Sequence, residues 1–164
     1  MARMTAARAA VEILKLEGVT SVFGVVPRLR PLGLEAQVIA DNLIAIVNQR
    51  LVRQVCPFCS TEAPFTDAEL AWLALEAGAV GRRGAGCDRC RDSGYYGRLP
   101  VYDVLIVDEA LANGIADDIG REGIRALTYS RGFKNIETIS KARVVAGQTT
   151  AEEVMRVVGV GPAP

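Results

Sequence analysis

Cys56-Pro57-Phe58-Cys59 and Cys87-Asp88-Arg89-Cys90 contain all four cysteines of the chain, as two Cys-x-x-Cys pairs separated by residues 60–86. Two residues between a pair of thiolates let one tight turn present both sulfurs to the same ion, and two such turns complete a tetrahedron. Zinc suits this ligand set, because thiolate is its preferred ligand and four sulfurs leave no open coordination position. The spacing therefore predicts a structural Zn²⁺ site with the ligands Cys56, Cys59, Cys87 and Cys90.

Three other interpretations of the four cysteines stay open. A mononuclear iron or an iron–sulfur cluster uses the same ligands, although the chain shows no redox-partner motif. A redox dithiol usually lies in a βαβ context, and that pattern does not surround these pairs. Disulfide bonds are typical of secreted proteins, and nothing in the sequence indicates secretion. Elemental analysis distinguishes zinc from iron.

Three arginines, Arg53, Arg89 and Arg91, flank the cysteine pairs. Four thiolates around Zn²⁺ leave the site with a net negative charge. We expect the three guanidinium groups to offset that charge.

The composition excludes several classes of function. The chain has 164 residues, 19 basic and 19 acidic side chains, and no histidine. This length fits one ordinary domain or two small ones. Without histidine there is no Ser-His or Cys-His dyad and no imidazole ligand for a metal. Zero net charge argues against a general nucleic-acid-binding protein, and no apolar run approaches the roughly 20 residues that span a membrane.

The phosphate-binding pattern Gly-x-x-x-x-Gly-Lys-Ser/Thr is absent from the chain. It needs a lysine directly after a glycine, whereas Lys15, Lys134 and Lys141 follow a leucine, a phenylalanine and a serine. The acidic pairs at 117–118 and 152–153 lie at predicted helix ends, where carboxylates cap helices and complement the helix dipole. We therefore predict no catalytic residue.

Apolar periodicity and capping signals predict an α+β chain that is mainly helical. Helices are predicted over residues 4–17, 34–55, 66–77, 108–118, 121–130, 138–146 and 150–158, strands over residues 19–26 and 98–107, and a loop rich in glycine and arginine over residues 81–86. Thr66 and Thr150 each stand three residues before a glutamate, Glu69 and Glu153, which is the pattern of a capping box. Trp72 is predicted to anchor a core.

Several further motifs occur in a fixed order around the cysteines. Gln49-Arg50-Leu51-Val52-Arg53 leads into the first pair, and Gly94-Tyr95-Tyr96-Gly97-Arg98 follows the second. Val101-Tyr102-Asp103-Val104-Leu105 comes next, and residues 141–157 close the series. From about Arg28 to Val158 the chain resembles the C-terminal region of the secretion ATPases, the hexameric motors of type II secretion and type IV pilus assembly.

This resemblance implies a division of the chain into segments. They are a long helix from the end of the ATPase core over 27–55, a zinc-ribbon-like tetracysteine subdomain over 56–98, and a C-terminal strand with a helical bundle over 99–164. The family's phosphate loop, acidic Mg²⁺ motif and histidine motifs lie upstream of the matching region. We therefore expect a truncated C-terminal part, incomplete relative to the family, that binds and hydrolyses no ATP on its own.

The same resemblance implies where the chain works and with what. The expected partners are ATPase subunits and inner-membrane proteins of a secretion or pilus machine. The zinc site would serve subunit packing and coupling to those partners. We expect a cytoplasmic chain, held at the inner membrane only through partners, with no membrane span and no nucleic acid.

The first residues resemble a different family. Residues 4–25, ending in Gly18-Val19-Thr20-Ser21-Val22-Phe23-Gly24-Val25, are similar to the start of thiamine-diphosphate enzymes of the carboligase and acetolactate synthase group. That family continues with Pro-Gly and a catalytic glutamate, whereas Val26-Pro27-Arg28-Leu29 follows here. We expect residues 1–26 to be a foreign leader, joined near residue 26, that binds no thiamine diphosphate.

Three rival functions remain. One is a subunit of a split motor that hydrolyses ATP in trans, and another is thiamine-diphosphate chemistry from the leader. The missing phosphate loop and the missing glutamate argue against these two. The third is a free-standing zinc-ribbon adaptor for protein or nucleic acid, and the nucleic-acid form lacks a basic excess near the cysteines. The preferred prediction is a non-catalytic motor segment with one structural zinc.

Overall fold

The structure, a computed structural model, describes residues 29, 33–159 and 161 of the chain. These residues form two compact units. Unit 1 comprises the described residues up to 48 and residues 104–133, and unit 2 comprises residues 49–103 and the described residues from 134 onward. The predicted leader over 1–26, with its helix and strand, lies outside the described residues. No helix of the described part is long and apolar enough to cross a membrane.

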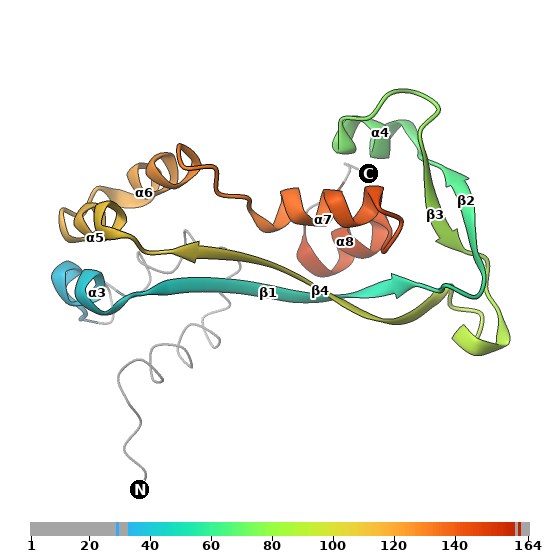
Figure 1. Cartoon of the computed structure of the whole chain (residues 1–164), viewed down its shortest axis with the longest axis horizontal. Coiled ribbons are helices and arrows are strands. Elements are labelled where there is room, and N and C mark those ends of the chain that lie inside the picture. Colours follow the sequence, from blue (N-terminus) through green and yellow to red (C-terminus); the bar gives the residue numbers. More distant parts are fainter. Residues whose placement is uncertain (1–28, 30–32, 160, 162–164) are drawn as a thin grey trace, which may run out of the picture. The chain divides into compact units, whose positions relative to one another are not determined.

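The described part has an α+β fold, which confirms the predicted class. It contains the helices α3 to α8 and two two-stranded sheets, one of β1 with β4 and one of β2 with β3 (Figure 1). Each unit combines two separate stretches of the chain. One boundary between the units falls within β1, so residues 45–48 of this strand belong to unit 1 and residues 49–55 to unit 2. The predicted segments 27–55, 56–98 and 99–164 are continuous and do not follow this division.

The predicted helix over 34–55 is wrong for most of its length. Helix α3 covers only Ala36–Asn42, and Ala45–Val55 form strand β1. Side chains along β1 alternate between the two faces; Ile46, Asn48 and Val52 are buried, and Val47, Gln49 and Leu51 are exposed. This two-residue period belongs to a strand, and the β-branched side chains of the segment favour it. Apolar residues on both faces of a strand look like one very wide stripe on a helix.

Strand β4 (Tyr95–Ile106) confirms the strand predicted over 98–107 and pairs with β1. Its side chains alternate strictly at the end of the strand, where Val101, Asp103 and Leu105 are buried. Figure 1 shows the arrows of β1 and β4 running in opposite directions.

Strands β2 (Ser60–Pro64) and β3 (Val80–Gly84) form an antiparallel pair in which Ser60 lies opposite Gly84. The loop predicted over 81–86 is therefore wrong for its first residues. A segment rich in glycine and arginine has little strand propensity of its own. It is a strand here because its backbone pairs with β2.

Helix α4 (Asp67–Leu73) follows β2 and begins with the predicted capping box. The Glu69 N–H donates to Thr66 Oγ1 over 3.3 Å, and the Thr66 N–H donates to Glu69 Oε2 over 2.9 Å. Two of the unpaired N–H groups at the helix start are satisfied in this way. The helix ends at Ala74, which takes a left-handed conformation with φ 56°.

The core of unit 1 lies between α3, α5 (Glu109–Ala116) and α6 (Gly120–Tyr129). Its buried apolar side chains are Leu29, Ile39, Ala40, Ile46, Leu105, Leu111, Ile115 and Ile124. Helix α5 starts at the predicted cap, where the Leu111 N–H donates to Asp108 Oδ1 over 2.9 Å.

Unit 2 holds α7 (Ile136–Val145) and α8 (Ala151–Val158). Its buried apolar side chains fall into two clusters, one of Leu73, Val144, Ala151 and Val154 and one of Val52, Val101 and Ile136. Trp72 packs against the first cluster, as predicted, and its Nε1–H donates to Glu137 over 3.2 Å. The four C-terminal helices therefore do not share the single bundle core that was expected, because α5 and α6 pack in unit 1 and α7 and α8 in unit 2.

Candidate metal centre

Two turns carry the four cysteines in unit 2. The first follows the end of β1 at Val55, and Cys59 leads directly into β2. The second lies between β3 and β4 and contains a short 3₁₀ helix, Asp88–Cys90. The predicted pairs thus stand at the ends of both sheets, where a strand ends and its backbone can turn.

Backbone hydrogen bonds hold the two turns side by side. The Cys56 N–H donates to the Gly94 carbonyl over 2.9 Å, and the Ala85 N–H donates to the Cys59 carbonyl over 3.0 Å. The backbones of Gly84 and Gly94 approach so closely that a Cβ added at Gly84 would overlap the Gly94 carbonyl. Glycine at position 84 is therefore a condition for the two turns to meet.

The four thiol sulfurs lie within 4.8 Å of one another. The Sγ–Sγ distances are 4.0 Å for Cys56–Cys87, 3.8 Å for Cys59–Cys90 and 3.6 Å for Cys87–Cys90. These values match the sulfur–sulfur edge of a ZnS₄ tetrahedron, about 3.8 Å for Zn–S bonds of about 2.3 Å. They are far longer than a disulfide bond of about 2.05 Å, and all four cysteines are free thiols. The four cysteines are therefore close enough to hold one metal ion.

The environment of the sulfurs differs from one turn to the other. Burial, reinforced by the other three thiols, raises the pKa of Cys59 to about 12. Burial opposes ionisation of Cys90 as well, but hydrogen bonds from the Gly94 and Cys87 backbone, together with the neighbouring thiols, lower its pKa to about 7. The Cys87 N–H lies 3.2 Å from Cys90 Sγ. If all four sulfurs are ionised, their negative charges repel one another. A bound divalent metal ion would offset that repulsion.

Two of the three flanking arginines make contacts that the sequence did not predict, while the expected offset of the site's charge stays a prediction. Arg53 is bound to Glu153, and the guanidinium of Arg89 lies over the Phe58 ring at 4.4 Å from its centroid. Phe58 in turn meets Tyr96 edge to face at 5.6 Å between ring centroids. Arg89 therefore packs on the first turn through cation–π contact.

Glu153, which the sequence predicted as a helix-end carboxylate in a capping box, is fully buried. The Thr150 side chain accepts from the Glu153 N–H over 3.2 Å, so half of the predicted box is confirmed. The carboxylate itself does not reach back to Thr150. Its Oε1 accepts from the Arg53 N–H over 2.9 Å and from Arg156 over 2.7 Å. The one sequence signal for this contact is the arginine that precedes the first cysteine pair, Arg53, which needs an acidic partner.

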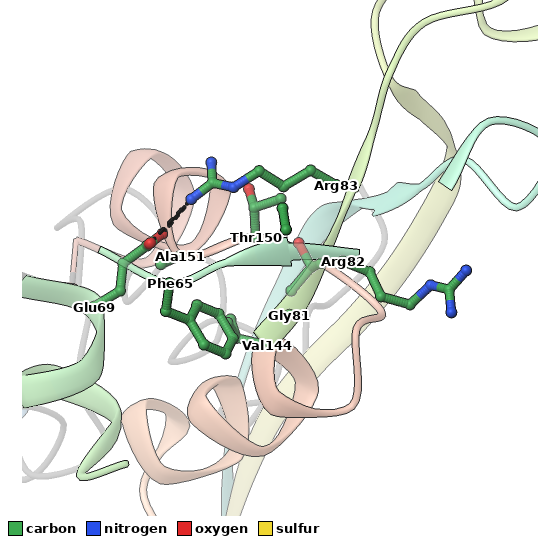
Figure 2. Close-up of a pocket in the computed structure, with 10 residues that line it drawn as sticks. Phe65, Glu69, Gly81, Arg82, Arg83, Val144, Thr150 and Ala151 are labelled. Atoms are coloured by element: carbon green, nitrogen blue, oxygen red, sulfur yellow. Dashed lines mark hydrogen bonds and ion pairs between the residues drawn. The ribbon is translucent and has the colours of Figure 1, made fainter. Parts of the chain in front are cut away.

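Figure 2 shows a small cavity in unit 2 beside the start of α8. Phe65, Gly81 and Val144 line it, and an ion pair of 2.7 Å between Arg83 and Glu69 crosses the view. Its volume of about 10 Å³ admits one water molecule at most. This cavity is too small to bind a substrate.

The fold and the site together define an α+β protein with four cysteines placed to hold one metal ion. The model of the family "Type II/IV secretion system protein" matches residues 19–156, and the chain belongs to that family. The match begins at residue 19, inside the predicted leader, and therefore does not support a junction at residue 26. That residues 1–18 come from another family stays a prediction.

Curated relatives agree with the family. The chain is 36% identical over 140 residues to the type II secretion system ATPase E of Vibrio cholerae, covering 82% of this chain and 27% of that protein. It is 32% identical over 139 residues to the type II secretion system protein E of Aeromonas hydrophila, covering 84% and 28%. It is 34% identical over 134 residues to the type IV pilus assembly ATPase PilB of Thermus thermophilus, covering 79% and 15%. The chain thus spans between about a seventh and about a quarter of these relatives.

Proposed function

We propose that this chain is a non-catalytic, zinc-stabilised segment of a secretion or pilus assembly motor. The observation that carries the proposal is the close approach of the Cys56, Cys59, Cys87 and Cys90 sulfurs, all within 4.8 Å of one another, in a chain of this family. A four-sulfur shell leaves no coordination position for water or substrate, so the metal acts in folding rather than in chemistry. Bound zinc would join the end of β1 to the turn before β4 in a small zinc-ribbon-like subdomain.

The proposal assigns ATP hydrolysis to other parts of the machine. The sequence has no lysine after a glycine and therefore no phosphate-binding loop. Two of the relatives are named ATPases of type II secretion and of type IV pilus assembly. The partners of this chain are accordingly ATPase subunits and inner-membrane proteins of such a machine, on the cytoplasmic side.

Elemental analysis of the purified full chain, run beside an ATP hydrolysis assay, tests the proposal. We expect one zinc per chain and no ATP turnover above the buffer. The variant Cys87→Ser should lose most of the zinc, because three thiolates bind it far more weakly than four. The control Ser130→Ala, which removes a hydroxyl at the end of α6 in unit 1, should keep it.

Two outcomes would contradict the proposal. Iron in place of zinc would assign the cysteines to a redox centre. ATP turnover that follows the protein through purification would show that the chain is catalytic after all.

A further inference from the structure

Residues 148–153, the end of the loop before α8 and the first turn of that helix, form an entry segment that contacts the strand just ahead of the metal centre. The Arg53 N–H donates to Glu153 Oε1 over 2.9 Å, and Thr149 Oγ1 donates to the Arg53 carbonyl over 2.9 Å. Both backbone polar groups of Arg53 thus bind the entry segment. Arg53 stands three residues before Cys56.

The side chains repeat this connection. Arg53 Nε lies 2.9 Å and its terminal nitrogen 2.8 Å from Glu153 Oε2, and Arg156 Nε donates to the same oxygen over 2.8 Å. Glu153 has no exposed surface, whereas the side chains of Arg53 and Arg156 are 42% and 58% exposed. A buried carboxylate with every acceptor site occupied allows few alternative arrangements of its partners.

The entry segment also contacts the strand that follows the second cysteine turn. The Tyr95 ring packs against the Arg53 guanidinium at 4.1 Å, and its hydroxyl is hydrogen-bonded to Thr150 Oγ1 over 2.7 Å. Tyr95 begins β4, directly after the second cysteine turn. Ser93 Oγ donates to the Cys90 carbonyl over 2.6 Å and accepts from the Tyr95 N–H over 3.2 Å, which joins that turn to the strand.

Strand β1, which precedes the first cysteine turn, and strand β4, which follows the second, are therefore both bound to the entry segment. We propose that Glu153 is a positioning residue for the metal centre, which holds Arg53 and, through it, Tyr95 so that both cysteine turns are prearranged for one ion. The inference rests on the proposed function, because it requires that the four cysteines bind a metal. By linkage, the bound metal stabilises the docked α8 by the same factor that docked α8 strengthens metal binding.

The zinc affinity of the full chain, measured by competition with a chromophoric chelator, tests this positioning role. Glu153→Gln keeps the shape of the side chain but removes its charge, and it should weaken zinc binding by about tenfold, as for other groups that orient metal ligands. Tyr95→Phe removes only the hydroxyl and its bond to Thr150, and it should weaken binding by about two- to threefold. At saturating Co²⁺ both variants should show the tetrathiolate spectrum of the wild type.

Two controls separate positioning from general loss of stability. Ile124→Ala removes buried volume from the core of unit 1, which contains no residue of the entry segment or of the cysteine turns. Its zinc affinity should change by less than about twofold even where its urea unfolding midpoint falls as far as that of Glu153→Gln. Glu137→Gln makes the same chemical change at the carboxylate bound to Trp72, and it should leave zinc affinity unchanged.

The outcomes distinguish the inference from the function beneath it. A wild-type chain that takes up no zinc would overturn both. A wild-type chain that binds zinc, with Glu153→Gln and Tyr95→Phe equally tight, would overturn the positioning role alone. Equal weakening of binding in Glu153→Gln and Ile124→Ala would assign the effect to stability and also overturn it.

Discussion

At the scale of single residues, Glu153 is a fully buried carboxylate bound by two arginines. Burial alone would raise its pKa, because a buried charge is poorly solvated. Hydrogen bonds from Arg156 and Arg53, with the charge of Arg53, more than offset this and lower the pKa of Glu153 from 4.5 to about 2. Glu153 is therefore ionised in the folded chain well into the acid range.

The lowered pKa makes stability depend on pH. Because the folded value lies below the unfolded value of 4.5, Glu153 contributes stability above about pH 4.5, and this contribution is lost as the pH falls to about 2. A shift of this size corresponds to about 3 kcal/mol. We expect Glu153→Gln to be less stable than the wild type at pH 7 and the difference to shrink toward pH 2, as measured by urea unfolding.

The exposed neighbour Glu152 supplies the control for this experiment. Glu152→Gln should follow the wild-type dependence on pH throughout, since this exposed change leaves the contacts of Glu153 in place and, with them, the metal affinity. A constant difference between wild type and Glu153→Gln from pH 7 to pH 2 would contradict the lowered pKa.

At the scale of elements, the pairing of strands and turns depends on glycine at one crossing. Gly84 ends β3 where a Cβ would overlap the Gly94 carbonyl, and Gly94 itself has φ 72°. The first glycine provides space and the second provides a left-handed turn. Both conditions must hold for the turn of Cys87 and Cys90 to reach that of Cys56 and Cys59.

Gly84→Ala tests this crossing. We expect a loss of about 2 kcal/mol in the free energy of unfolding and weaker zinc binding, because the added methyl group forces the turns apart. Gly78→Ala is the control, since Gly78 has a left-handed φ of 89° but no neighbour within 4 Å of an added Cβ. Its cost should stay near 1 kcal/mol with zinc affinity intact. A smaller loss at Gly84 than at Gly78 would argue against the crowding.

At the scale of the whole molecule, the four cysteines are not shared between the two units. All four cysteines belong to unit 2, and the buried residues of unit 1 include none of them. In small zinc-binding domains, metal binding supplies on the order of 10 kcal/mol of folding free energy. Removing the metal should therefore act on one unit before the other.

Hydrogen exchange with and without a chelator measures this difference. We expect backbone amides of residues 56–98 and of α8 to lose protection when zinc is removed, while the amides of α5 and α6 keep theirs. Adding zinc back should restore the protection. Equal loss in both units would mean that the chain unfolds as one cooperative body.

Sequence alone determined the parts of this protein that rest on local chemistry. The spacing of the cysteines, the caps at Thr66 and Asp108, the strand before Asp108 and the four helices after it all depend on residues a few positions apart, and each can be read without knowing the fold. The tertiary structure decided what depends on distant partners. Residues 45–55 form a strand that pairs with β4. The carboxylate of Glu153 binds Arg53, 100 residues away, instead of the backbone of its own helix cap. Strand pairing and a buried ion pair stabilise the chain only after folding has brought such residues together. A local sequence pattern therefore does not predict which distant residues will pair.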